Sequence, residues 1–350
     1  MAAAPTEDAE ARKRARHDKQ FAAAVQTTVP QLLAVAGLIF GGCCSNVFTL
    51  EAIVQSNPQA GNLITFVQFV VVAAEGYVHH FDRRRPPTFL EPAHVPFMRW
   101  VGIVALFFAV SVLNNYVWQF HISVPVHIIF RSGGTVVTMA VGHLAGRRYS
   151  ARQVASVVLL TAGVVTATLG SSSGGGGGGG GTQREFALGI ALLLLAQVLS
   201  AVMSLATELT YRQYGNHWRE NLFYTHFLSL PFFAPAWPSI ARELRALGAS
   251  GPLVVAGTTL PVARDYVLLA LNGLTQYVCV RGVNKLAGSA TAVTVTIVLN
   301  VRKCVSLLLS VYVFGNTLSA GTCAGAALVF AGAGWYSLES AALRRKAKAA

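Results

Sequence analysis

The chain has 350 residues, of which 53% are hydrophobic and only 12% are charged. With a mean hydropathy of +0.52, it has too few charges to cover a soluble globule of this size, so the composition excludes that class and predicts an integral membrane protein. Lysine and arginine (27) exceed aspartate and glutamate (14). Because these cations cluster between apolar segments, they favour a role in membrane topology over nucleic-acid binding.

Ten segments are predicted to cross a bilayer, whose hydrocarbon core requires roughly 20 apolar residues of helix. They are residues 29–50, 62–81, 99–119, 124–145, 152–170, 186–208, 221–239, 264–282, 287–312 and 317–338. The seventh segment is interrupted by Pro231, Pro235 and Pro238, and the ninth contains two cations. The expected fold class is therefore all-α, with ten transmembrane helices.

The charge of the connections predicts the orientation of these spans. Both terminal tails and the even-numbered connections hold most of the lysine and arginine. The opposite side holds only Arg184, Arg242, Arg245 and Arg264. Positively charged connections stay in the cytosol, so both termini are predicted to be cytosolic, which requires an even number of spans.

A low-complexity run, SSSGGGGGGGG from Ser171 to Gly181, separates the fifth and sixth spans and is typical of a flexible linker. It divides the chain into two halves of five predicted helices. The predicted domains are a basic cytosolic tail (1–28), a first five-helix repeat (29–170), a lumenal linker (171–185), a second repeat (186–338) and a cytosolic tail (339–350).

The two halves share a weak internal similarity. The sequence LNNYV (113–117) in the third span is echoed by LTQYV (274–278) in the eighth. Arg131 in the fourth span likewise corresponds to Arg302 and Lys303 in the ninth. Two inverted five-helix repeats would place these cations around one central site, as in repeat-built transporters.

The three intramembrane cations predict the ligand of that site. A charge at mid-bilayer costs roughly 2.5–3.5 kcal/mol, so such residues usually face a polar cavity or an anionic ligand. Arg131, Arg302 and Lys303 together suit an organic pyrophosphate, because arginine binds phosphate in a bidentate manner and lysine as a compact charge. Arg302 and Lys303 point about 100° apart on a helix, and Lys303 is favoured for direct contact. The alternative is pairing with an internal carboxylate, with Glu75 as the candidate for a coupling or structural role.

Polar and aromatic residues on neighbouring spans are candidates for the rest of the pocket. They are Asn114, Asn115, Tyr116, Phe223, Tyr224, His226, Asn272, Gln276 and Tyr277. Aromatic rings stack on nucleobases, and asparagine binds base edges or sugar hydroxyls. The alternatives are interhelical hydrogen bonds for asparagine and interfacial anchoring for tyrosine. His226 and His127 suit either proton coupling or hydrogen bonding within the bundle.

The cysteines and the C-terminus carry two further predictions. Five cysteines, at positions 43, 44, 279, 304 and 323, lie in or beside apolar runs, without a CxxC pair or a histidine at metal-ligand spacing. We therefore expect buried thiols and no disulfide framework, metal or cofactor. The chain ends in RRKAKAA, in which Lys346 and Lys348 resemble a dilysine retrieval signal that coat proteins read. The alternative is an ordinary cytosolic tail.

Several segments together resemble one known family. They are GGCCSNVFTLE (41–51), GNLITFVQF (61–69), AEGY (74–77), SVLNNY (111–116), FRSG (130–133), LFYTH (222–226), TQYVCVRGV (275–283) and TVTIVLNVRK (294–303). This set is similar to nucleotide-sugar transporters for UDP-N-acetylglucosamine and UDP-xylose, of the solute carrier 35B type. The resemblance implies the ten-helix drug/metabolite transporter fold, no enzymatic activity, and exchange of a cytosolic UDP-sugar for lumenal UMP across the ER or Golgi membrane.

Motifs of the GDP-mannose transporters extend this resemblance. Their FYNN and GALNK motifs imply that Phe223, Tyr224 and His226 lie by the nucleotide and that Asn284 and Lys285 lie by the sugar. Thr225 replaces the first asparagine of FYNN, which argues against guanine, and the segment GVNK (282–285) lacks the leucine of GALNK.

Two other functions remain open from the sequence. One is a carrier of a different phosphorylated metabolite on the same fold. The other is a membrane enzyme such as a glycosyltransferase, against which stand the few acids, the lack of a DxD motif and the lack of a loop long enough for a catalytic domain. The sequence does not rank UDP-N-acetylglucosamine against UDP-xylose as the substrate. It also leaves the oligomeric state open between a monomer and a homodimer.

Overall fold

The computed structural model describes residues 30–57, 59–116, 133–172, 183–255, 258–314 and 320–349. These residues are mostly helical. The helices are η1 (Leu38–Gly42), α2 (Cys43–Ser56), α3 (Gly61–His79), α4 (Phe97–Tyr116), α6 (Gly134–Leu144), α7 (Ala151–Ser172), α8 (Gln183–Tyr214), α9 (Trp218–Phe227), η3 (Leu230–Ala236), α10 (Trp237–Leu247), α11 (Arg264–Ala287), α12 (Ala292–Phe314) and α13 (Ala320–Ala349).

Four helical stretches among the described residues are long and apolar enough to cross a membrane. They are Pro30–Val54, Gly61–His79, Phe97–Asn114 and Ala187–Tyr214, and two shorter apolar helices lie at Gly134–Leu144 and Ala151–Ala167. Helices suit this environment because lipid offers no partner for backbone N–H and C=O groups. Large apolar side chains such as Leu194 and Leu195 of α8 are exposed on the outside of the bundle, as expected for a lipid-facing surface. The count of ten spans remains a prediction.

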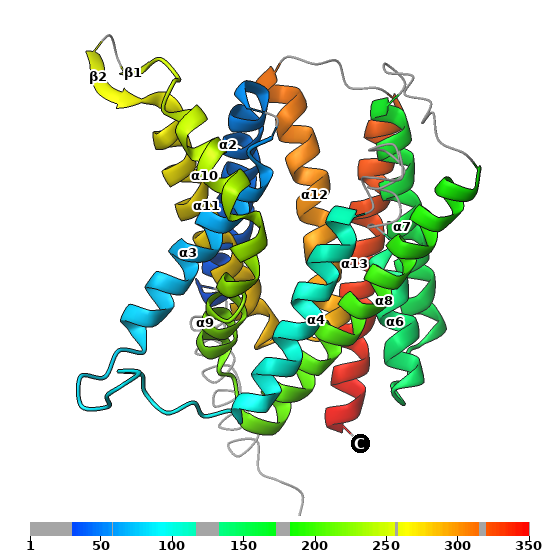
Figure 1. Cartoon of the computed structure of the whole chain (residues 1–350). Coiled ribbons are helices and arrows are strands. Elements are labelled where there is room, and N and C mark those ends of the chain that lie inside the picture. The colour runs from blue at the N-terminus through cyan, green and yellow to red at the C-terminus, as the bar shows by residue number, and fades with distance from the viewer. Residues whose placement is uncertain are drawn as a thin grey trace, which may run out of the picture.

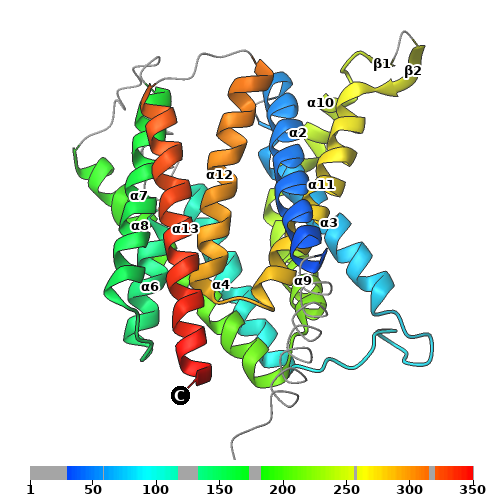
Figure 2. The same cartoon turned by 180° about the vertical axis from the view of Figure 1, so that it is seen from behind.

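The helices form two groups with α12 between them (Figures 1 and 2). In the first group, α11 packs against α2 and α3, and α3 packs against α9. In the second group, α4 and α6 both pack against α8, and α7 packs along α13. Helix α12 contacts α6, α7, α8 and α13 of the second group and α2 and α11 of the first. Each half of the sequence therefore contributes helices to both groups.

The predicted seventh span, residues 221–239, is not one continuous helix. Helix α9 ends at Phe227, and the 3-10 segment η3 and the separate helix α10 follow it. Pro231 and Pro238 are the second residues of these two elements, and Pro235 lies inside η3. Proline lacks the N–H that a continuing α-helix needs, so the chain here breaks into short pieces.

Two features of the described fold were not predicted. The strands β1 (Pro252–Val255) and β2 (Thr258–Ala263) form an antiparallel hairpin between α10 and α11, so the fold is not purely α-helical. Helix α13 also continues to Ala349, through the residues expected to form a C-terminal tail. The exposed Lys346 of the dilysine motif lies near its end.

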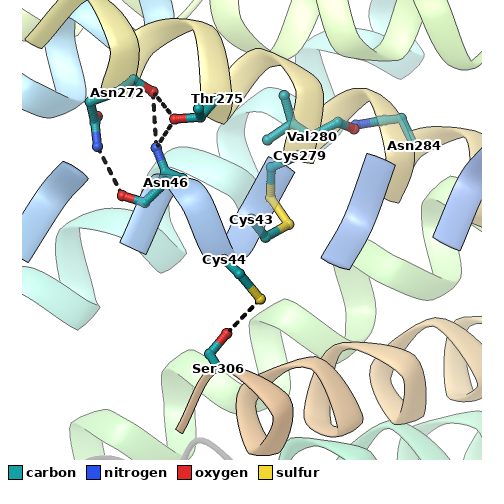
Figure 3. Close-up of a disulfide and its surroundings, with 9 residues drawn as sticks. All are labelled: Cys43, Cys44, Asn46, Asn272, Thr275, Cys279, Val280, Asn284 and Ser306. Atoms are coloured by element: carbon teal, nitrogen blue, oxygen red, sulfur yellow. Dashed lines mark hydrogen bonds between the residues drawn. A yellow bond between two sulfur atoms is a disulfide. The ribbon is translucent and has the colours of Figure 1, made fainter. Parts of the chain in front are cut away.

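The expectation of no disulfide is wrong. Cys43 of α2 and Cys279 of α11 form a disulfide, with a sequence separation of 236 residues (Figure 3). Their spacing could not show it, because the bond depends on α2 and α11 being neighbours in space. Cys44 and Cys304 are buried free thiols, as predicted, and Cys323 is exposed.

Candidate functional site

Helix α12 carries Lys303 at one end of a short polar chain. The Lys303 Nζ donates a hydrogen bond to Asn300 Oδ1 at 3.1 Å. The Asn300 Nδ2 donates in turn to Thr135 Oγ1 of α6 at 2.9 Å. Asn300 is only 3% exposed, and an amide in such a place has to be hydrogen-bonded to offset its burial. The ammonium group is thus positioned by a network that joins α12 to α6.

A cavity of about 210 Å³ lies beside this network, between α4, α6, α8 and α12. Its lining residues are Val110, Asn114, Gly134, Thr135, Thr138, Ala196, Gln197, Ser200, Thr296, Leu299, Asn300, Arg302 and Lys303. Arg302 and Lys303 both reach it, although they are consecutive on the helix. The described lining therefore combines two cations with hydroxyl and amide groups, which suits an anion with hydrogen-bonding oxygens.

Asn114 is the predicted pocket residue of α4 that lines the same cavity. Its Nδ2 donates to the carbonyl of Val110, one turn earlier, at 2.8 Å. Its Oδ1 is buried, and no partner for it lies within the described part of the chain. A buried acceptor of this kind is available to a donor on a ligand, such as a hydroxyl or amide.

Four polar side chains of α6 and α8 that line the cavity were not among the predicted pocket residues. They are Thr135, Thr138, Gln197 and Ser200. A signal for Gln197 was present, because it is an amide inside the apolar run ALLLLAQVL, and polar side chains within a span usually face the bundle interior. The threonines gave no such signal, since threonine can satisfy its hydroxyl on its own helix, as Thr138 does with the carbonyl of Gly134 at 2.7 Å.

The predicted aromatic residues of α9 lie in the first helix group rather than at this cavity. Phe223 is 1% exposed and stacks on Phe227. The ring of His226 lies 4.8 Å from that of Phe69, and its Nδ1 bonds to the carbonyl of Leu222 at 2.8 Å. This arrangement corresponds to the alternative of a histidine satisfied within the bundle. Tyr224 packs near Trp100, with ring centroids 6.2 Å apart.

A second group of predicted residues lies where α9 meets α11. Asn284 Oδ1 accepts a hydrogen bond from Asn221 Nδ2 at 2.8 Å, and Lys285 Nζ lies 5.7 Å from the centre of the Trp218 ring. Cation and ring attract each other at this separation. These contacts hold the start of α9 against the end of α11, away from the α4–α12 cavity.

The middle of α11 carries Tyr277, whose hydroxyl accepts a hydrogen bond from Arg281 Nη1 at 2.9 Å. Glu75 of α3 lies beside the same hydroxyl. It is not among the described residues that line the cavity around Lys303. Gln276, the neighbour of Tyr277, is half-buried on α11.

Three other predictions have different outcomes. Asn272 is fully buried and bonds to Asn46 and to Gln68, which corresponds to the interhelical alternative. Arg131 and His127 lie outside the described residues. Asn115 and Tyr116 end α4, and their side chains also lie outside the described part.

A bundle of apolar helices around a polar, cationic cavity defines a membrane-embedded transporter. The chain belongs to the UAA transporter family, whose sequence profile matches residues 31–340. The resemblance to nucleotide-sugar transporters is thereby confirmed, and the chain belongs with transporters rather than enzymes.

Named relatives cover almost the whole chain. The UDP-N-acetylglucosamine transporter yea4 of Schizosaccharomyces pombe is 45% identical over 310 residues, which are 87% of this chain and 95% of that relative. The UDP-xylose and UDP-N-acetylglucosamine transporter of Danio rerio is 38% identical over 312 residues, 86% of this chain and 92% of the relative. A solved crystal structure with a TM-score of 0.58 and 16% identity covers 88% of this chain and 98% of its own. That last likeness concerns the fold alone.

Proposed function

We propose that this chain is an antiporter that carries UDP-N-acetylglucosamine, UDP-xylose or both from the cytosol into the ER or Golgi lumen in exchange for UMP. The observation that carries the proposal is that Arg302 and Lys303 line one cavity with Asn114 and other polar side chains. The names of the relatives support UDP-sugars as the substrates. The retrieval-signal role of Lys346 and Lys348, read by coat proteins, belongs to the same proposal.

In this mechanism the α12 cations bind the diphosphate, and Arg131 of the fourth predicted span joins them. The α9 aromatics and the α9–α11 contacts, with Tyr277, Asn284 and Lys285, hold the nucleoside and sugar in another conformation of the cycle. Two inverted five-helix repeats would relate the halves of the chain by a pseudo-two-fold axis. In that arrangement the third and sixth predicted spans, α4 and α8, correspond to the eighth and first, α11 and α2. The packing of α4 on α8 and of α11 on α2 supports this relation.

Obligatory exchange has a physical reason in this arrangement. A cavity with two cations and no bound anion is costly to enclose in lipid. A bound UDP-sugar or UMP lowers that cost in both directions, so the loaded protein changes conformation more readily than the empty one. Movement of the two helix groups past each other then exposes the cavity to each side in turn.

The test uses proteoliposomes preloaded with UMP and supplied with labelled UDP-N-acetylglucosamine. Lys303→Ala should abolish uptake, and Lys303→Arg should retain part of it. Lys346→Ala is the matched control, because this lysine is exposed and is not among the described residues that line the cavity. Uptake by this variant should equal that of the unmodified chain. Unchanged uptake by Lys303→Ala would remove this lysine from the mechanism.

The competing function is a carrier of another phosphorylated metabolite on the same fold. Competition of labelled uptake with UDP, UMP, GDP and sugar phosphates separates the two. Inhibition by UDP and UMP at concentrations where GDP and sugar phosphates have no effect supports the UDP-sugar assignment. Running the exchange assay over several UDP-sugars then ranks N-acetylglucosamine against xylose.

A further inference from the structure

One buried acid differs from the others in its partners. Four acidic side chains are buried in the described part of the chain: Glu208, Glu220, Glu243 and Asp265. Three of them form salt bridges with arginine. The ion-pair contacts of Glu220 are instead with two histidines, His94 and His217. Because histidine can be neutral at physiological pH, this carboxylate has no permanently charged ion-pair partner among the described residues.

The three side chains offer their ligand atoms to one point. The Nδ1 of His94 lies 2.5 Å from Glu220 Oε1, and the Nδ1 of His217 lies 3.9 Å from the same oxygen. All three ligand atoms lie within 4.8 Å of one another. The two imidazole rings stack with centroids 4.4 Å apart. Segments far apart in sequence thus meet here, namely the connection that enters α4 and the first turn of α9.

The other nitrogen of His217 fixes its tautomer. Its Nε2 lies 3.0 Å from the carbonyl oxygen of Tyr214. A carbonyl only accepts, so Nε2 carries the proton, and in the neutral ring the Nδ1 keeps its lone pair toward Glu220. Metal-binding histidines are usually held in this way, with the second ring N–H donated to a carbonyl or carboxylate.

The Glu220 carboxylate is also held in place from outside the cluster. Its Oε1 accepts a hydrogen bond from the backbone N–H of His94 at 2.9 Å. Its Oε2 accepts from the backbone N–H of Val95 at 3.3 Å and from Trp100 Nε1 at 3.4 Å. A carboxylate fixed by such donors is a preorganised ligand, because its orientation does not have to be established when an ion binds.

We propose that His94, His217 and Glu220 form a binding site for a divalent transition metal, with Zn²⁺ as the best match. Two imidazole nitrogens, one carboxylate oxygen and a water complete the four ligands that Zn²⁺ prefers. Ligand atoms bound to one zinc ion lie about 3 Å apart, so His94 has to move outward by a fraction of an ångström, and the Nδ1 of His217 has to approach Glu220 by about 1 Å. The His94 side chain is 64% exposed and that of His217 is 28% exposed, which leaves room for both movements.

Metal binding at this place has a structural consequence. The ion would join the α3–α4 connection to α9, at the end of the bundle that is predicted to face the cytosol. Helix α9 packs in the first helix group, and α4 packs on α8 in the second. The site therefore restrains the two groups relative to each other, independently of which sugar nucleotide is carried.

Direct metal titration tests the proposal. The purified full-length chain, without a polyhistidine tag and stripped by a chelator, is titrated with Zn²⁺ in competition with a chromophoric chelator. We expect one Zn²⁺ per chain with a Kd of about 1 µM or below. His94→Gln and His217→Gln should each weaken binding at least about tenfold. Co²⁺ should give the d–d absorption of a tetrahedral site, and both variants should lose it.

The matched control is His143→Gln, an exposed histidine near the end of α6 whose Nδ1 contacts a backbone carbonyl. It should bind Zn²⁺ as the unmodified chain does. Elution on size exclusion and the melting temperature without metal establish that the variants are folded. Zn²⁺ should raise the melting temperature of the unmodified chain and of His143→Gln, but not of the other two variants. Absence of binding at micromolar Zn²⁺, or equal binding by all variants, would overturn the proposal.

Discussion

The two sides of helix α2 are built differently. Toward α11, two kinds of bond connect the helices: the disulfide of Cys43 with Cys279, and reciprocal hydrogen bonds between Asn46 and Asn272 (Figure 3). Toward α12, the polar contact is the noncovalent pair of Cys44 Sγ and Ser306 Oγ, 3.1 Å apart. One side of α2 is therefore covalently tied, whereas the other is held by contacts that can separate without breaking a covalent bond.

This difference suggests which surfaces slide in a transport cycle. A disulfide limits how far two packed helices can part, so we expect α2 and α11 to move together. Conformational change concentrates where two arrangements have similar free energies, and we expect the helix groups to separate at the α2–α12 surface. Ser306 lies there, about one turn beyond Lys303 on α12. Substitutions on the two sides of α2 test this contrast.

The largest effect, on transport, is expected from a disulfide on the α12 side of α2 that matches the native one on the α11 side. In Ser306→Cys, the new thiol faces Cys44, and a separation of 3.1 Å is only about 1 Å longer than a disulfide bond. Oxidation should tie α2 to α12 and reduce UMP exchange by at least about tenfold, because the cavity can no longer open to both sides. A mild reductant should restore exchange.

Two controls accompany this crosslink. The unmodified chain under the same oxidant and reductant shows the effect of the redox treatment itself, including that on the native disulfide. Ser306→Ala removes the hydroxyl without a thiol, and its exchange should not respond to oxidation. Mass spectrometry verifies that Cys44 of the Ser306→Cys variant has formed the new disulfide. Full exchange by the chain crosslinked in this way would show that α2 and α12 do not separate.

The second prediction removes the covalent tie between α2 and α11. Replacing Cys43 and Cys279 by serine should lower the free energy of unfolding by about 2–4 kcal/mol, because the disulfide closes a very long loop. Unfolding in mixed micelles measures the change. Cys323→Ser is the matched control, since this exposed thiol is free, and its stability should be unchanged. Equal stability of the double variant would mean that packing alone holds the two helices together.

The third prediction concerns how closely α2 and α11 approach. A Cβ at Gly42 would lie 2.7 Å from the backbone nitrogen of Cys279 and 2.7 Å from Val278 Cγ1. Gly42→Ala should therefore destabilise the protein by about 1–3 kcal/mol through overpacking. Gly41→Ala is the control on the adjacent residue, because nothing lies within 4 Å of its added Cβ. It should be neutral or slightly stabilising, as alanine favours helix over glycine. Melting temperatures of the two variants give the comparison, and equal values would contradict it.

The same contrast explains how far the sequence could predict the molecule. Intramembrane cations and apolar runs are local signals, so the membrane class, most helices and the candidates Arg302, Lys303 and Asn114 could be recognised from the amino acids alone. The Cys43–Cys279 bond, the Asn46–Asn272 pair and the His94–His217–Glu220 cluster depend on which helices are neighbours. A single sequence without known contacts does not contain that information, and proline breaks such as those after Phe227 shift helix ends by local geometry.

The smallest effect is expected from the asparagine pair on the tied side of α2. Asn46 Nδ2 donates to the carbonyl of Asn272 at 2.9 Å, and Asn272 Nδ2 donates to the carbonyl of Asn46 at 3.1 Å. Hydrogen bonds between membrane helices contribute on average about 0.6 kcal/mol and at most about 1.7 kcal/mol. Asn46→Ala should cost an amount in that range. Each amide bonds to the backbone carbonyl of the other residue, which an alanine substitution leaves in place, so the loss in the double variant with Asn272→Ala should equal the sum of the two single losses. A coupling energy clearly different from zero would show that removing one amide shifts α2 relative to α11 and so weakens the other bond. Repeating the cycle in a chain that lacks the disulfide sharpens the result: coupling that arises only there would mean that the covalent bond is what keeps α2 and α11 in register when one amide is lost.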